Sequence, residues 1–235
     1  MTVEVFRRDA ALWARIDRPA AANACGSTVM AGLEAWLARA TEPGVRVLVL
    51  TGTGRHFCAG ADMTEGTALL GDQPALRAFL DRGRQLVRAV RRSPVPTIAA
   101  VNGVAFGGGL ELLLACDIAI AADTARLGDR HIAAAQVPGW GSSVLLPQAI
   151  GPAAARRLLL TGETWTGPEA AAHGLVSESV PAAALESRVT ALAERLAGLD
   201  ATAMARLLRV ARPAIDEPAW DREWQTLTEH LASQE

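Results

Sequence analysis

Two short glycine-bearing segments could aim backbone N–H groups at a single anionic oxygen. Residues 59–62 (Ala-Gly-Ala-Asp) follow the apolar run 45–50, and residues 107–109 (three glycines) follow the apolar run 97–101. The second segment leads directly into an apolar helical stretch, so its free N–H groups and the helix dipole favour negative charge. Such donors can form an oxyanion-binding site. Tight turns and close packing of helix on strand explain the same glycines equally well.

The elements expected around these segments alternate between strand and helix. Short strands are predicted at 3–6, 12–16, 45–50, 97–101 and 118–121, and a long helix at about 74–92. Strand, glycine segment, helix and strand in this order predict an α/β fold with right-handed crossovers. Helices dominate from about residue 142. A change of composition near Pro181 predicts a core of residues 1–180 and a helical C-terminal region of residues 181–235.

Composition excludes several classes of chemistry. The chain has 235 residues with 25 acidic and 23 basic side chains; all 23 are arginine, and there is no lysine or tyrosine. A Schiff-base lysine, a phosphate-binding lysine loop and a tyrosine acid are therefore excluded. The balanced charge gives no indication of a nucleic-acid partner.

Targeting and metal signals are equally sparse. The chain shows no signal peptide and no apolar run of about 18 residues, so we expect a cytoplasmic protein without a membrane partner. Its three cysteines are far apart and form no CxxC motif, so neither a disulfide framework nor a zinc site is predicted.

Several motifs follow one another in a fixed order between about residues 12 and 180. They are Arg18 and Pro19 with Asn23 and Ala24, 47–52 (VLVLTG), 57–63 (FCAGADM), 100–111 (AVNGVAFGGGLE), 116–117 (CD), 138–139 (PG), 160–162 (LTG) and 174–176 (GLV). In this order the motifs resemble the enoyl-CoA hydratase/isomerase superfamily, also called the crotonase superfamily. The resemblance implies a crotonase-like ββα spiral core and a C-terminal helical region that mediates trimerisation, with a homotrimer or a dimer of trimers as the assembly.

The resemblance also implies a binding site for an acyl-CoA thioester. The backbone N–H groups of Ala61 and Gly108 would form the oxyanion hole for the thioester carbonyl. Arg55 would meet a CoA phosphate, since a guanidinium suits bidentate phosphate contacts. Coenzyme A arrives as part of the substrate, so no separate cofactor and no metal are expected. The substrate-binding residues would be Ala24, Arg55, Ala59, Asp62, Met63, Gly139 and Trp140.

Two side chains are expected to transfer protons. Glu111 matches one of the two catalytic glutamates of family hydratases, whereas the position of the second, seven residues before Pro138, holds His131. An imidazole can accept or donate a proton near neutral pH, so a Glu/His pair could add water across a 2-enoyl-CoA thioester or remove it. The plainer alternatives are a first-turn glutamate favoured by the helix dipole and a non-catalytic pocket histidine.

Other reactions of the superfamily remain open to different degrees. Gly139 stands where family hydrolases and dienoyl isomerases place an aspartate, and branches that need lysine or tyrosine are closed. Isomerisation, C–C cleavage, carrier-linked thioester chemistry and acyl-CoA binding without turnover remain alternatives. Asp129 could act as a nucleophile beside His131, although we expect a solvated turn aspartate. The arginines at 82, 84, 88, 91 and 92 are expected to form a solvated helix face, and Trp220 and Trp224 to make packing or subunit contacts.

Overall fold

Apolar runs rich in β-branched residues form a central sheet of six strands. The computed structural model describes residues 2–233. Only β1 and β2 pair antiparallel, and the other neighbours are parallel. Every residue of β3 and β5 is buried, as expected for parallel strands covered on both faces. The sheet order is β1 (Val3–Arg8), β2 (Ala11–Ile16), β3 (Val47–Gly52), β5 (Thr97–Val101), β7 (Ile118–Ala122) and β10 (Glu178–Val180).

A second, smaller sheet lies against the first and carries the loops of interest. Strands of three residues contain too few positions for a periodic pattern, so β4, β6 and β8 were not predicted from the sequence. Their function in the fold is to bring the segments that follow them to one edge. The order is β4 (His56–Cys58), β6 (Val104–Phe106), β8 (Arg126–Gly128) and β9 (Trp165–Thr166).

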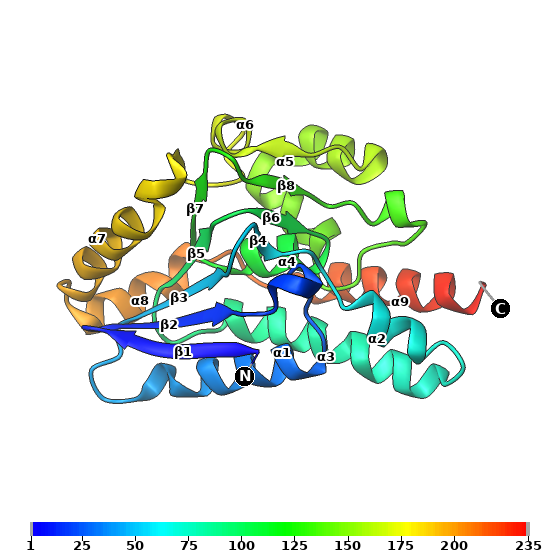
Figure 1. Ribbon diagram of the computed structural model, residues 1–235, viewed down its shortest axis with the longest axis horizontal. Coiled ribbons are helices and arrows are strands. Elements are labelled where there is room, and N and C mark those ends of the chain that lie inside the picture. The colour runs from blue at the N-terminus through cyan, green and yellow to red at the C-terminus, as the bar shows by residue number, and fades with distance from the viewer. Residues whose placement is uncertain (1, 234–235) are drawn as a thin grey trace.

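Helices cover both sheets, and Figure 1 shows α7 and α8 at one end of the molecule and α2 and α9 at the other. This alternation of strands and helices confirms the predicted α/β class. In the described residues, no helix is both long and apolar enough to cross a membrane. The helices are α1 (Ser27–Ala38), α2 (Met63–Ala68), α3 (Gln73–Arg91), α4 (Gly108–Ala115), α5 (Ser142–Thr161), α6 (Gly167–Ala172), α7 (Leu185–Ala197), α8 (Ala201–Ala211) and α9 (Glu217–Ala232).

The C-terminal helices share the core of the strands to different extents. Leu185 and Val189 of α7 and Trp220 of α9 belong to the same buried cluster as the central sheet. Helix α8, in contrast, contains no buried residue. The division of the chain at residue 180 stays a prediction, because apolar packing runs across it.

Two arginines of α3 attach α9 to the body of the protein. The side chains of Arg84 and Arg88 are only about a tenth exposed; Arg88 pairs with Glu217 at 2.6 Å and Arg84 with Asp221 at 2.9 Å. Their guanidinium groups also lie 5.3 Å from the rings of tryptophans on α9. The expectation of a solvated arginine face is therefore wrong for these two residues, because α9 lies over them.

Candidate active site

The two glycine-bearing segments meet at one edge of the small sheet. A methyl group added at Gly60 would lie 3.1 Å from the Phe106 carbonyl oxygen and 3.5 Å from the Gly108 nitrogen. A bridge formed by the Cys25 N–H to Gly60 and the Asp62 N–H to Cys25 fixes the first segment. That bridge does not use the Ala61 N–H. Within residues 2–233, neither the Ala61 nor the Gly108 N–H has a hydrogen-bond acceptor, so both are free to receive an anionic oxygen.

Close approach of other groups requires glycine in the second segment. Gly107 has φ +49°, a conformation that disfavours residues with a side chain. A methyl group at Gly108 would lie 2.3 Å from Cζ3 of Trp140, and one at Gly109 would lie 1.9 Å from the Cys58 carbonyl oxygen. The sequence left tight packing and placement of N–H donors as alternative reasons for these glycines. In the structure, the same segment serves both purposes.

Asp62 fixes the start of α2. Its Oδ1 accepts the backbone N–H groups of Thr64 and Glu65, and its Oδ2 accepts Nη1 of Arg18 at 2.8 Å. Burial alone would raise the pKa of Asp62, but the hydrogen bond from Arg18 and the backbone donors lower it. The same Arg18 nitrogen also donates to the Ala24 carbonyl, so it joins two of the predicted binding segments.

The Glu111 carboxyl is buried in the first turn of α4. Its Oε1 accepts the N–H groups of Trp140 at 2.9 Å and Ser142 at 3.0 Å. Burial raises the pKa of Glu111 to about 8; the positive charge of His131 opposes this rise, while Glu223 adds to it. A carboxyl group with such a pKa exchanges protons close to physiological pH, as general acid–base chemistry requires. An ordinary solvated first-turn glutamate is thereby excluded.

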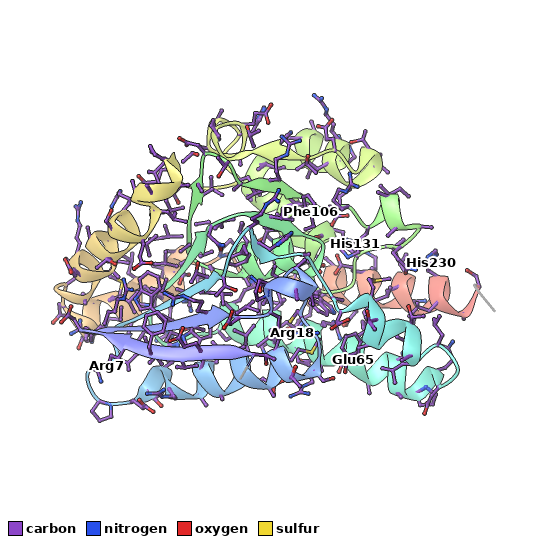
Figure 2. All side chains as sticks on the ribbon, viewed as in Figure 1. Arg7, Arg18, Glu65, Phe106, His131 and His230 are labelled. Atoms are coloured by element: carbon purple, nitrogen blue, oxygen red, sulfur yellow. The ribbon has the colours of Figure 1, made fainter. Side chains whose placement is uncertain are left out.

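His131 lies beside the second glycine segment and pairs with a buried carboxylate. A methyl group at Gly107 would lie 3.5 Å from His131 Nε2, and Figure 2 shows His131 in the same part of the molecule as Phe106. The Nδ1 atom lies 2.9 Å from Oδ2 of Asp129, which is only 1% exposed. Burial lowers the pKa of His131, but the Asp129 hydrogen bond and the charge of Glu111 raise it to about 9.

Asp129 therefore differs from its expected character. It is not a solvated turn residue, because it directly follows the buried end of β8 at Gly128 and is itself buried. Its Oδ1 also accepts the His131 N–H at 3.3 Å. A carboxylate on Nδ1 fixes the orientation of an imidazole and leaves Nε2 as the reacting atom. Asp129 thus acts as the partner of His131.

These groups surround a cavity of about 200 Å³, here called the glycine-loop cavity. Ala24, Ala59 and Arg55 do not line it; Arg55 is exposed in the turn between β3 and β4, and its phosphate contact stays a prediction. Eight of the predicted site residues line the cavity together: Ala61, Asp62, Met63, Gly108, Glu111, His131, Gly139 and Trp140.

The remaining wall of the glycine-loop cavity is mainly apolar and was not predicted. Leu76, Phe79 and Leu80 of α3 and Leu227 and Leu231 of α9 contribute to it, together with the polar side chains of Thr67 and Gln136. A methyl group at Gly139 would lie 2.2 Å from Leu227 Cδ2, so α9 packs directly on the Pro-Gly motif. The leucines of α9 stand at helical spacing, which marks an apolar face but not which surface it covers.

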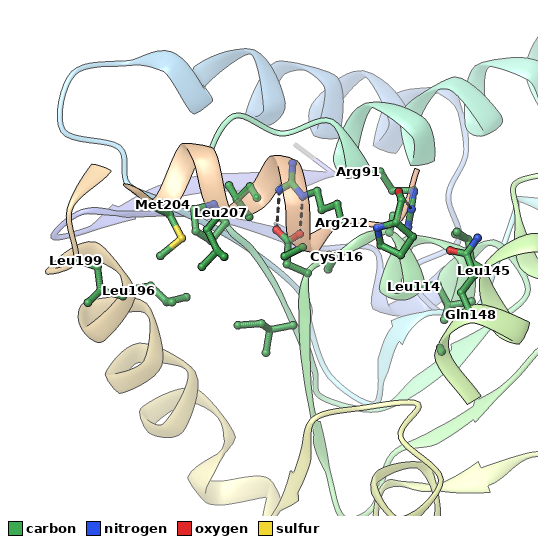
Figure 3. A pocket seen from close by; sticks show the side chains of 18 residues that line it. Arg91, Leu114, Cys116, Leu145, Gln148, Leu196, Leu199, Met204, Leu207 and Arg212 are labelled. Carbon is green, nitrogen blue, oxygen red and sulfur yellow. Dashed lines mark hydrogen bonds and ion pairs between the residues drawn. The ribbon is translucent and has the colours of Figure 1, made fainter. Parts of the chain in front are cut away.

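A larger hollow of about 450 Å³, the α8 groove, lies beneath α8 (Figure 3). Its walls are mainly apolar, and its charged residues are Arg91 and the ion pair of Arg212 with Asp117, at 2.6 and 2.8 Å. Arg212 also donates to the carbonyl oxygens of Ser93 and Val95. The donors and acceptors of this pair are used by each other and by the backbone, so the α8 groove offers apolar surface instead of proton transfer.

Comparisons with known proteins agree with this geometry. Residues 8–226 match the family model for enoyl-CoA hydratase/isomerase. The chain is 38% identical over 191 residues to a probable enoyl-CoA hydratase of Bacillus subtilis, covering 80% of this chain and 74% of that protein. It is 40% identical over 206 residues to a probable enoyl-CoA hydratase of Mycobacterium bovis, covering 86% and 76%. The crystal structure of enoyl-CoA hydratase from Bacillus anthracis superimposes with a TM-score of 0.87 at 31% identity, covering 99% of this chain and 92% of that one. Fold, cavity and sequence together show that the chain belongs to the enoyl-CoA hydratase/isomerase family, with the crotonase fold.

Proposed function

We propose that this enzyme adds water across the double bond of a 2-enoyl-CoA thioester and catalyses the reverse reaction. The observation that carries the proposal is that Glu111 and His131 line the same cavity as the two segments with free N–H groups. Hydration needs both: donors for the carbonyl oxygen, and two groups that exchange protons with water and with the α carbon.

The N–H groups of Ala61 and Gly108 would receive the thioester oxygen. Addition of a nucleophile at the β carbon moves electrons onto this oxygen, and two fixed donors stabilise the enolate that forms. Removing one donor from such a site typically slows a reaction by roughly 10²–10³-fold. Gly108 also begins α4, whose dipole favours the same negative charge.

Glu111 and His131 would divide the proton transfers. In the hydration direction, the Glu111 carboxylate takes a proton from water as the oxygen bonds to the β carbon. Protonated His131, held by Asp129, gives a proton to the α carbon as the enolate collapses. One proton is taken and one is given, so transfer between the two residues restores the enzyme. The raised pKa values of both groups suit these roles.

The walls of the cavity suit an apolar acyl group. Phe79, Trp140 and Leu227 present hydrocarbon surface next to Glu111, and contact with such surface stabilises an alkyl or aryl chain. The CoA arm would run past Ala24, Ala59 and Met63. Arg55, exposed in the neighbouring turn, would contact a CoA phosphate.

The assembly is proposed to be a homotrimer or a dimer of trimers. Helix α8 leaves Leu207 56% exposed and Val210 79% exposed, and the apolar α8 groove lies directly beneath it. Apolar surface of this kind is typical of contacts between subunits. Light scattering combined with gel filtration would measure the assembly directly.

Hydration is tested by following the loss of enoyl-thioester absorbance with crotonyl-CoA and longer enoyl-CoA substrates. Wild-type protein should convert them, and Glu111→Gln should lose about 10²–10⁴-fold in kcat, the usual contribution of a proton-transfer group. Equal activity of the two proteins would refute the role of Glu111. Mass spectrometry of the products over a thioester panel separates hydration from isomerisation, C–C cleavage and carrier-linked chemistry. Binding without any product would indicate an acyl-CoA-binding protein instead.

A further inference from the structure

Helix α9 brings a further buried carboxyl group close to the glycine-loop cavity, in addition to those of Glu111 and Asp129. Glu223 is 5% exposed, and its Oε2 accepts both the backbone N–H of Ser143, at 2.8 Å, and the Ser143 hydroxyl. Its Oε1 is buried and has no hydrogen bond of standard geometry within the described residues, and the Gly141 N–H is close enough to the carboxyl to lower its pKa. A buried carboxyl group with one oxygen so poorly satisfied is costly for packing alone, which favours a role for its charge.

Glu223 and Glu111 hold the same short segment of backbone. Glu111 accepts N–H groups from Trp140 and Ser142, and Glu223 accepts the N–H of Ser143. These donors belong to one run of residues at the N-terminus of α5, where N–H groups have no partners within the helix. The Glu111 carboxyl therefore reaches this run from α4 and the Glu223 carboxyl reaches it from α9. Each carboxyl holds the backbone segment that the other also contacts.

Helix α9 is also firmly held in this position. The ion pairs of Arg84 and Arg88 attach it to α3. On its inner side, a methyl group at Gly141 would lie 2.5 Å from the Trp220 ring, so the helix rests directly on the 140–143 segment. Glu223, one turn beyond Trp220, is thus presented to the segment by a helix that contacts the body of the protein on two sides.

We propose that Glu223 is a positioning residue for the reaction: it fixes the 140–143 segment that orients the Glu111 carboxyl, and its own carboxylate acts on Glu111 as a buried charge in addition to that of Asp129. The proposal rests on the proposed hydration in that it assigns Glu111 a catalytic orientation. It extends the site to α9, a helix more than a hundred residues away in the chain.

The electrostatic surroundings agree with this assignment. Three titratable groups act on Glu111: His131 lowers its pKa, and Glu223 and Asp129 raise it. Burial raises the pKa of Glu223 itself, while hydrogen bonds from Ser143 and Gly141 and the charge of His131 oppose that rise. On α3, Arg84 and Arg88 face α9 and pair with Asp221 and Glu217, and Arg77 lies 5.8 Å from the ring of Trp224.

Kinetics of Glu223→Gln and Glu223→Ala separate positioning from packing. The amide of Gln keeps an oxygen acceptor for Ser143 but has no charge, so kcat should stay within about threefold while the acidic limb of the pH–rate profile moves to lower pH. Ala removes the acceptor, so kcat should fall roughly 10–100-fold with KM nearly unchanged, as for a small misplacement of a catalytic group. Glu229→Gln, an exposed glutamate on the same helix, is the matched control and should leave both quantities unchanged.

A titration without turnover distinguishes this proposal from the proposed hydration. The Glu111 side-chain carbon, labelled with ¹³C and assigned with Glu111→Gln, should titrate at lower pH in Glu223→Gln than in wild type. An unchanged titration would overturn the proposal, whether or not the enzyme hydrates any thioester. A loss of kcat in Glu223→Ala that merely follows a lower melting temperature, with no shift in Glu223→Gln, would also overturn it.

Discussion

The glycine-loop cavity and the α8 groove differ in how their buried charges are satisfied. In the larger α8 groove, Asp117 and Arg212 bond each other and the nearby backbone. In the smaller cavity, Glu111 is buried and His131 half-buried, and both have pKa values displaced from their ordinary ranges. Size therefore does not identify the site in this molecule. We expect proton transfer in the cavity where the pKa values of Glu111 and His131 are displaced and backbone N–H groups are free, and a structural role for the ion pair of Asp117 with Arg212.

The largest expected loss of activity comes from Gly108→Ala, which fills the space in front of Trp140. Gly108→Ala places a methyl group 2.3 Å from that ring, so the loop must shift and carry its N–H away from the substrate oxygen. We expect a loss of about 10²–10³-fold in kcat for crotonyl-CoA, measured at saturating substrate. Gly71→Ala, where a methyl group meets nothing within 4 Å, is the control. Wild-type kcat in Gly108→Ala would contradict the donor role.

Asp129→Asn should weaken the proton transfer without emptying the cavity. Asparagine cannot stabilise protonated His131, so the basic limb of the pH–rate profile should move to lower pH and kcat should fall roughly 10–100-fold, part of the usual contribution of a proton-transfer group. Asp123→Asn, whose carboxylate accepts the Ser179 hydroxyl away from the cavity, should match wild type. A profile identical to wild type in Asp129→Asn would show that His131 does not depend on its partner.

The pH dependence of wild-type kcat/KM should be bell-shaped with its maximum between about pH 8 and 9. The rate rises as Glu111, with a pKa of about 8, loses its proton and becomes a base. It falls as His131, with a pKa of about 9, loses the proton that it donates. At pH 7 the rate should be roughly sevenfold below the maximum, since only about a tenth of Glu111 is then ionised and about three fifths of the enzyme is in the active form at the maximum. A flat profile from pH 6 to 8 would exclude Glu111 as the base.

A substitution in the α8 groove should lower the stability of the protein and leave its activity unchanged. Arg212→Leu leaves Asp117 largely buried without its cation, so the free energy of unfolding should fall by about 2 kcal/mol. The value of kcat should not change, because neither residue lines the glycine-loop cavity. Urea unfolding and crotonyl-CoA kinetics on the same preparation test this. If Arg212→Leu lost activity at wild-type stability, the α8 groove would affect the reaction, and the distinction between it and the glycine-loop cavity would be refuted.

The sequence predicted the parts of this arrangement that depend on local pattern. Buried strands such as β3 and β5 are continuous apolar runs, and the glycine segments with Glu111 and His131 stand in a recognisable order, so both the fold and the residues around the cavity could be expected. The roles of these residues stay predictions until the variants are measured.

Contacts between elements that are distant in the sequence could not be predicted in this way. Glu223 is an ordinary glutamate on an amphipathic helix until α9 is seen to lie against the 140–143 segment. Arg88 likewise belongs to a charged stripe that is solvated in an isolated helix and buried once Glu217 covers it. Burial of Asp129 follows from the turn after β8, a strand too short to leave a pattern. In each case the environment comes from a distant element, and a local window contains no signal for it.

The position of α9 in the chain has a consequence for biosynthesis. Domains fold as the chain emerges, N-terminal parts first. The strands, both glycine segments and Glu111 are made before α9, which brings Leu227 and Leu231 to the cavity wall and Glu223 to the 140–143 segment. A ribosome-bound chain that stops before α9 would therefore lack these parts of the wall around Glu111. The last described helix to be translated is thus the one that completes the glycine-loop cavity.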